Sequence, residues 1–305
     1  MSTFLPRRLL RMAVTLWVIV TCVFMATRLT GNPIDYLMPE GLDAEGRAAM
    51  IAYWGLNRDP FDQYILFWRS LVQGEFGLGL MERRPVTVIF GERMGRSLAL
   101  LTLTMTATIA IGVPLGVLTA VWRERRLGSW VLFAAFLGYA IPNFVLAILM
   151  ILLFSFALHW LPSAGATTAW HYIMPTATLA AYFVAALVRY TRNAMLDVLG
   201  QDYMRTAHAK GLSPMVVLIR HGLRNALIPV VTLIGLQAPI LIGGAVIMEQ
   251  IFVIPGMGLL LLEAVGRRDY PVITGVFLLV GVVVMLINLI VDLSYGLLDP
   301  KVRYR

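Results

Sequence analysis

The stretch "LGSWVLFAAFLGYAIPNFVLAILMILLFSFALHWLPSAGATTAWHYIMPTATLAAYFVAALV" runs from Leu127 to Val188 and contains no Asp, Glu, Lys or Arg. A water-soluble fold does not readily bury so long an uncharged stretch, whereas a lipid bilayer accepts it. A membrane-spanning helix needs about 20 apolar residues, so the stretch has room for two. Its middle, Leu158–Tyr172, carries the Pro, Gly, Ser and Thr of a turn and the Trp and Tyr of a membrane interface. The stretch therefore predicts two membrane helices joined by a short loop.

The composition of the whole chain agrees with a membrane protein. Of its 305 residues, 59% are hydrophobic and 14% are charged, whereas soluble domains carry about 25% charged residues. The net charge of +8 does not indicate nucleic-acid binding, because the basic residues lie between apolar spans and not on one face. The single cysteine, Cys22, excludes an intrachain disulfide, and its apolar setting argues against redox or metal chemistry.

We predict an all-α membrane protein with six transmembrane helices. The expected spans are residues 9–29, 98–121, 130–157, 173–190, 227–249 and 271–293. The first is expected to be retained, because its apolar run exceeds that of a cleaved signal peptide. Lys and Arg gather at the amino terminus, in the loops after the second and fourth spans and in the tail, so both termini and these loops are expected to be cytoplasmic. Arg267 and Arg268, on the outer side, are an exception.

Four segments are expected along the chain. Residues 1–30 form an amino-terminal transmembrane helix, and residues 31–96 form a periplasmic segment. Residues 97–294 form a transmembrane domain of five helices with a cytoplasmic loop at 200–225, and residues 295–305 form a cytoplasmic tail. Within the periplasmic segment, the apolar spacing between Pro60 and Gly74 predicts one short helix.

The stretch "DYMRTAHAKGLSP", from Asp202 to Pro214, predicts a short helix in the cytoplasmic loop. Asp202 is suited to cap its amino terminus, Gly211 to close it in a left-handed conformation, and the Ser-Pro pair to start another helix. A helix this short is marginal in water unless it packs on something. The small Ala207 and Ala209 permit the close approach of a partner protein. An ordinary capped connector is the alternative, and local chemistry leaves both open.

The same stretch, followed by "RHGLRNALIPVVT", resembles the signature loop of the permeases of binding-protein-dependent ABC importers. Thr206, Ala207 and His208 stand in the places of its E-A-A motif, and Gly211 follows. His221 stands where the general pattern has Ile, a departure that matches the peptide subfamily (dipeptide, oligopeptide, glutathione and nickel). "GEFGLGLMERRPV", "LPSAGA" and "PGMGLLLLEAVGRRDYPVI" extend the resemblance over nearly the whole chain, which is most similar to glutathione-type permeases.

The resemblance implies the type I ABC importer permease fold in the bacterial inner (cytoplasmic) membrane. The chain would form half of a translocation path for di- or oligopeptides or glutathione, with a nickel chelate or an opine as alternative solutes. The implied partners are a second homologous permease subunit, two cytoplasmic ABC ATPase subunits and an external solute-binding protein. The short helix would be the coupling helix that contacts an ATPase. Its expected contact residues are Asp202, Arg205, Thr206, Ala207, His208, Ala209, Lys210 and Gly211.

The chain carries no ATPase motif of its own. A phosphate-binding loop reads G-x-x-x-x-G-K-[ST], and the only lysines, Lys210 and Lys301, are not in that setting. We therefore expect no enzymatic activity, no cofactor and no metal in this chain, with ATP and Mg bound by the partner ATPase subunits. A secondary transporter is the rival class, although no clear internal repeat of the kind such proteins show is present.

Three polar residues in the predicted spans are candidates for the translocation path: Asn143, Gln237 and Glu249. Pro142 predicts a kink in the third span, with Asn143 either facing the path or bonded to a neighbouring helix. Glu249, near the outer end of the fifth span, is a candidate gate or binding-protein contact. Gly112 and Gly116, four residues apart, predict a close helix contact and not transport chemistry.

Overall fold

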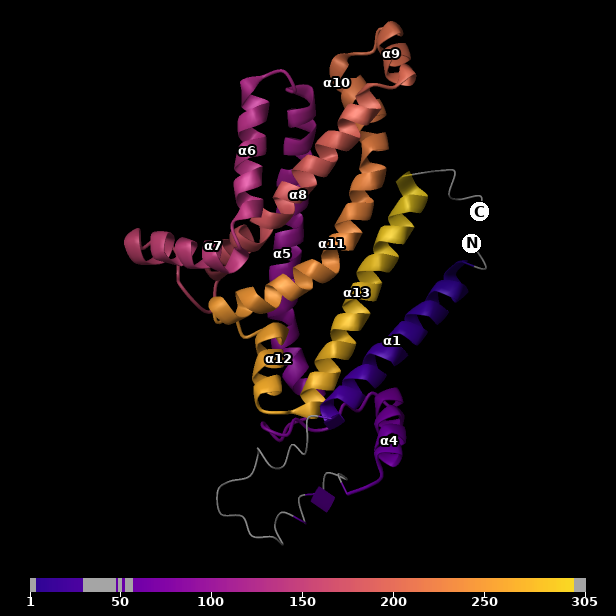
Figure 1. Cartoon of the computed structure of the whole chain (residues 1–305), viewed down its shortest axis with the longest axis vertical. Helices are drawn as coiled ribbons and strands as arrows, with labels where there is room; N and C mark the ends of the chain where they lie inside the picture. Colours follow the sequence, from indigo (N-terminus) through magenta and orange to yellow (C-terminus); the bar gives the residue numbers. More distant parts are fainter. Residues whose placement is uncertain (1–3, 30–47, 49–50, 53–56, 299–305) are drawn as a thin grey trace. The chain divides into compact units, whose positions relative to one another are not determined.

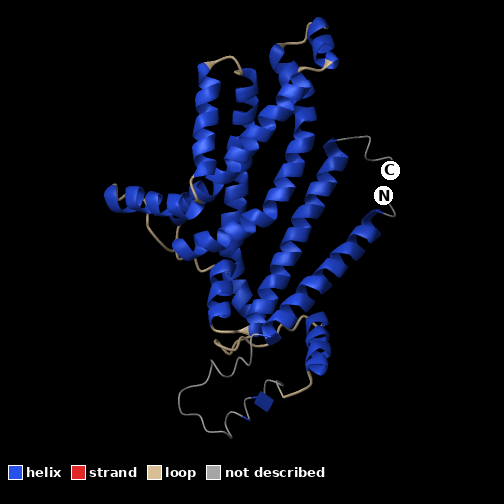
Figure 2. Ribbon diagram, viewed as in Figure 1, coloured by secondary structure: helices blue, strands red, loops and turns tan. Residues whose placement is uncertain are grey.

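The computed structural model describes residues 4–29, 48, 51–52 and 57–298 (Figure 1). Apart from one isolated bridge between Leu78 and Pro85, this part of the chain has no β structure, and its regular elements are helices (Figure 2). They are α1 (Phe4–Leu29), α4 (Pro60–Val72), α5 (Val86–Val121), α6 (Arg126–Ala140), α7 (Asn143–Met150), the π-helical η1 (Ile151–Ala157), the 3₁₀ turn η2 (Ala169–Tyr172), α8 (Ile173–Leu199), α9 (Asp202–Ala209), α10 (Pro214–Val216), the π-helical η3 (Val217–Leu223), α11 (Arg224–Ile251), α12 (Met257–Gly266) and α13 (Tyr270–Leu298).

Among the described residues, five helical stretches are long and apolar enough to cross a membrane, and a sixth is a bent pair. The five contain α1, α5, α8, α11 and α13, as predicted. The predicted third span, 130–157, is instead two helices, α6 and α7 with η1, that meet at an angle of 101°. Proline has no backbone N–H and holds the preceding residue in an extended conformation, and Ile141 has ψ 123° and Pro142 ψ 134°. The expected kink is therefore a complete break between helices.

The chain divides into two compact units that are not consecutive in sequence. The larger unit comprises Arg96–Pro255 and the chain from Val284 onward, and the smaller unit comprises Ser2–Gly95 and Gly256–Val283. The segments expected from the sequence follow chain order, whereas each unit joins distant parts of the chain. Residues 31–47, 49–50 and 53–56 of the expected periplasmic segment and the tail residues 299–305 lie outside the described part. The side of the membrane on which each end lies stays a prediction.

In the larger unit, α8 is the central helix and packs on α5, α6 and α11 (Figure 1). The predicted glycine contact is confirmed. A Cβ atom added to Gly112 would lie 2.9 Å from Leu187 Cβ, and one added to Gly116 would lie 2.4 Å from Thr191 Cβ. Only residues without a side chain allow α5 to approach α8 this closely. Gly244 of α11 is as tight, since its added Cβ would lie 2.8 Å from a methyl group of Leu179 in α8.

In the smaller unit, α4 packs on α1 through aromatic side chains. The ring of Phe24 lies 5.3 Å from that of Tyr64, and the Tyr64 hydroxyl lies 2.7 Å from Thr21 Oγ1. Asp59 caps α4, because its carboxylate accepts the Phe61 N–H at 2.9 Å. These contacts confirm the short helix that was predicted between Pro60 and Gly74.

Candidate coupling helix and translocation-path residues

The α9 helix begins directly after the sharp turn that follows α8. Gly200 ends α8, and Gln201, with an extended backbone (ψ 149°), takes the cap position of α9 without a side-chain cap bond. Asp202 was predicted to be that cap but is the first helical residue, where a negative charge still interacts favourably with the helix dipole. Its carboxylate lies 3.6 Å from the guanidinium of Arg205, and both side chains are exposed.

The other end of α9 has the predicted geometry. Gly211 has φ +74°, in the left-handed region that favours glycine, and its N–H donates to the carbonyl of His208 at 2.9 Å. Ser213 then takes the cap position of α10, and Pro214 lies in its first turn. Two short turns therefore hold α9 at the end of the larger unit, between α8 and α10 (Figure 1).

The two faces of α9 have different surroundings. Met204 (2% exposed) and Ala207 (5% exposed) are buried against Val217 of η3. Ala207 was expected to admit a partner protein, but the surface that approaches it belongs to this chain. The other expected contact residues all lie on the exposed side of α9 or at its ends: Asp202, Arg205, Thr206, His208, Ala209, Lys210 and Gly211.

Further contacts join α9 to the helices on either side. The Asn225 side-chain N–H donates to the Tyr203 hydroxyl at 3.3 Å, and so links α9 to the start of α11. A Cβ added to Gly222 of η3 would lie 3.3 Å from Met195 Cε of α8 and 3.5 Å from Met204 Cε of α9. This close packing leaves little room for α9 to move independently of α8 and η3.

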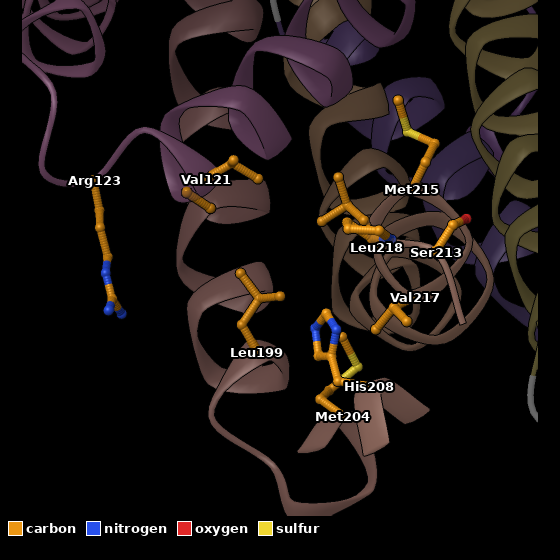
Figure 3. A pocket seen from close by; sticks show the side chains of 11 residues that line it. Val121, Arg123, Leu199, Met204, His208, Ser213, Met215, Val217 and Leu218 are labelled. Carbon is orange, nitrogen blue, oxygen red and sulfur yellow. The ribbon is translucent and has the colours of Figure 1, made fainter. Parts of the chain in front are cut away.

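A hollow of about 720 Å³ lies beside α9, between the end of α5, the end of α8 and α10 (Figure 3). Its walls are mostly apolar, with the charged Arg123 and the polar His208 and Ser213 among them. The remaining lining residues are Ala120, Val121, Leu199, Met204, Pro214, Met215, Val217 and Leu218. The exposed face of α9 and this hollow together form an uneven surface into which a partner protein could fit.

The candidate path residues do not form one site. Glu249 is buried (1% exposed) and accepts a hydrogen bond from Ser97 Oγ at 2.5 Å. The preceding residue in α5, Arg96, donates to the Pro255 carbonyl at 3.3 Å, so two neighbouring side chains of α5 hold the end of α11 and the turn that follows it. Sequence patterns did not single out Ser97, because nothing local marks a serine as the partner of a carboxylate so distant in the chain.

Gln237 and Asn143 lie elsewhere in the larger unit. Gln237 is buried in α11, two residues before Pro239. Asn143 is half-buried at the break before α7, and its Oδ1 atom is buried without a hydrogen-bond partner among the described residues. No three His, Cys, Asp or Glu side chains in this part of the chain gather in a cluster that could hold a metal ion.

In the smaller unit, Asp269 joins two distant segments. Its carboxylate accepts the Met81 N–H at 3.2 Å and the Val272 N–H at 3.4 Å, so it connects the loop before α5 to the first turn of α13. Burial raises the pKa of Asp269 above its ordinary value, although the backbone N–H groups that it accepts oppose this change.

Comparison with known proteins supports the resemblance found in the sequence. Residues 112–304 match the family model "Binding-protein-dependent transport system inner membrane component". The chain is 39% identical over 306 aligned residues, covering 100% of both proteins, to the glutathione transport system permease protein GsiC of Escherichia coli (strain K12) and to its namesake in Shigella dysenteriae serotype 1 (strain Sd197). The fold is similar to a chain of an inward-facing structure of the MetNI methionine ABC transporter, with a TM-score of 0.59, 21% identity, and coverage of 70% of this chain and 97% of that one.

Proposed function

We infer the function of this chain from its family: it belongs to the binding-protein-dependent transport system inner membrane components. It is a permease of an ABC importer, located in the bacterial inner membrane, and it has the all-helical fold of type I importer permeases. A permease of this family is a transport component and not itself an enzyme.

We propose that the transported solute is a short peptide and that glutathione is the first candidate. The observation that carries this proposal is the 39% identity, over the full length of both chains, to permeases named for glutathione transport. Similarity over the whole chain includes the helices that would form the path as well as the α9 loop that would contact the ATPase. A nickel chelate and an opine are the alternative solutes.

The energy for transport is proposed to come from two ABC ATPase subunits, which bind ATP and Mg and dock on α9 and its counterpart in a second permease. Charged and small side chains on the exposed face of α9 offer such a subunit both ionic contacts and close approach. A solute-binding protein on the opposite side of the membrane would deliver the substrate. This arrangement places α9 on the cytoplasmic side, as the distribution of Lys and Arg predicts.

The proposed mechanism depends on α9 moving together with its neighbours. Because Met204 and Ala207 are buried against η3, a displacement of α9 is passed to α8 and α11 and not absorbed in the loop. ATP binding can shift the permease between inward- and outward-facing states only if the ATPase pair binds the two states with different affinity. The fixed geometry of α9 lets it act as a lever between the ATPases and the spans.

The complex reconstituted in proteoliposomes, with its ATPases, second permease and binding protein, tests this function. We expect ATP-dependent uptake of radiolabelled glutathione that an uncoupler does not abolish. Arg205→Glu, on the exposed face of α9, should weaken co-purification of the ATPases, whereas Arg126→Glu, an equally charged change at the exposed start of α6, should not. Uptake that an uncoupler abolishes and ATP depletion leaves intact would identify a secondary transporter instead.

A further inference from the structure

The α8 helix carries an arginine that no carboxylate of the described chain neutralises. Arg189 lies at the end of the expected fourth span, 173–190, but α8 continues to Leu199, so this arginine lies inside a helix long enough to cross the membrane. Its side chain is exposed, and no carboxylate of the described residues lies within 4.0 Å of it. A charge in such a segment is costly and usually marks a functional position.

Two tyrosines fix the position of this guanidinium. The Arg189 Cζ atom lies 4.6 Å from the centre of the Tyr139 ring, in the geometry of a cation–π contact. Tyr139 of α6 in turn stacks on Tyr182 of α8, with ring centres 5.0 Å apart and an angle of 18° between the planes. Tyr182 precedes Arg189 by about two helical turns, so the arginine extends toward the amino-terminal half of α8. An arginine that only sought water would extend toward the nearer helix end, which leads to α9.

The backbone explains why the two rings meet. A Cβ atom on Gly138 would lie 3.1 Å from the Ala181 carbonyl oxygen, so α6 and α8 touch where both have small residues. The next residue of each helix is one of the stacked tyrosines. A few residues later the chain breaks at Pro142, and Asn143 has a buried side-chain oxygen without a hydrogen-bond partner among the described residues. The cation thus lies near a break in a span.

We propose that Arg189, held by Tyr139 and Tyr182, binds the carboxylate of a peptide on its way through the permease. This inference rests on the proposed function. A guanidinium binds a carboxylate through two parallel N–H···O bonds, and stacking on a ring face leaves the N–H groups at its edge available. Tyr139 is 41% exposed, so its ring lies at the surface of this chain. A substrate without a carboxylate gains nothing there, and the site therefore favours anionic peptides.

Uptake by the reconstituted complex tests the proposal with two substrates, glutathione and its diethyl ester, in which both carboxylates are esterified. Arg189→Gln should lower glutathione uptake by about tenfold, the scale of one charge-assisted hydrogen bond, and should change uptake of the ester much less. The comparison is made between variant and wild type for each substrate, so the preference of the binding protein cancels. Arg189→Lys keeps the charge but not the planar guanidinium, so its glutathione uptake should lie between that of wild type and that of Arg189→Gln.

Two further variants separate this role from a structural one. Arg126→Gln removes the same charge from the exposed start of α6 and should leave both uptakes unchanged. Tyr139→Leu, which removes the ring under the guanidinium, should reproduce the substrate selectivity of Arg189→Gln. Equal losses for glutathione and its ester, or loss of the second permease from the purified Arg189→Gln complex, would overturn the proposal in favour of a structural ion pair.

If the proposed function itself is wrong, the wild-type complex takes up neither substrate when ATP is supplied. A second measurement then decides the role of Arg189 without a substrate. In a Cys22→Ser background, an Arg189→Cys variant in inside-out vesicles should react with a membrane-impermeant thiol reagent, and ATP with vanadate should suppress that reaction. Labelling that is absent, or the same in both conditions, shows that Arg189 does not line a path that opens and closes.

Discussion

The left-handed turn at Gly211 offers a direct test of α9 as a lever. The residue has φ +74°, and a Cβ atom added there would meet nothing within 4 Å. A substitution therefore acts through the backbone alone. A left-handed conformation costs an L-residue about 1–2 kcal/mol, and a β-branched residue more. Burial of the Met204 side chain, which holds α9 in place, contributes about 1.5–3 kcal/mol. Strain at Gly211 is thus comparable to the packing that it would have to overcome.

These magnitudes predict a graded series. Gly211→Val should lower ATP-dependent glutathione uptake by about tenfold, since about 1.4 kcal/mol corresponds to a factor of ten. Gly211→Ala should lower uptake less than Gly211→Val, because alanine is not β-branched and enters the left-handed region at lower cost. Gly211→Asn should transport nearly as wild type, since Asn tolerates this conformation.

The assay is uptake by the reconstituted complex, normalised to the amount of permease in the membrane. Gly243→Val is the matched control, because its added side chain also starts in open space but its φ is not positive. Wild-type uptake in Gly211→Val, or an Asn variant as impaired as the Val variant, would refute the claim that the left-handed turn positions the lever.

Three further predictions concern stability, measured as the melting temperature of the purified complex. Gly116→Ala should lower it, because overpacking against α8 costs about 1–3 kcal/mol, or about 2–4 °C per kcal/mol, whereas Gly243→Ala in open space should not. Ser97→Ala should destabilise the protein by about 1–3 kcal/mol, since the buried Glu249 carboxylate loses a donor. Burial raises the pKa of Asp269 above 3.8. Between the unfolded and folded pKa values the native state then binds more protons, so stability falls as pH rises through that interval, and Asp269→Asn should remove this dependence.

Each of these stability predictions has an outcome that contradicts it. Equal melting temperatures for the two glycine variants would show that α5 and α8 can separate without cost. A double-mutant cycle of Ser97→Ala with Glu249→Gln that gives no coupling energy would show that the hydrogen bond between them is not stabilising. A melting temperature whose pH dependence is the same in wild type and Asp269→Asn would place that dependence on another group.

The sequence by itself determined the elements of this protein that depend on local chemistry. The length of the uncharged stretches predicted the membrane helices, because a helix of about 20 apolar residues crosses a bilayer. The positive φ at Gly211, the start of α10 at Ser213 and the helix between Pro60 and Gly74 followed from residues that favour one backbone conformation at one position. The family also followed from the sequence, because the signature of the α9 loop is contiguous.

Only the tertiary structure decided which surfaces meet. From the sequence, Ala207 is a small residue in a short helix whose buried face is not specified. Its packing on Val217 shows that it faces its own chain. The donor to Glu249 comes from another helix, 152 residues away in the chain, and the stacking that holds Arg189 requires α6 to meet α8 at Gly138. A helix shows the same local pattern whichever face it buries, so such contacts are set by how distant segments pack and not by the residues next to them in the chain.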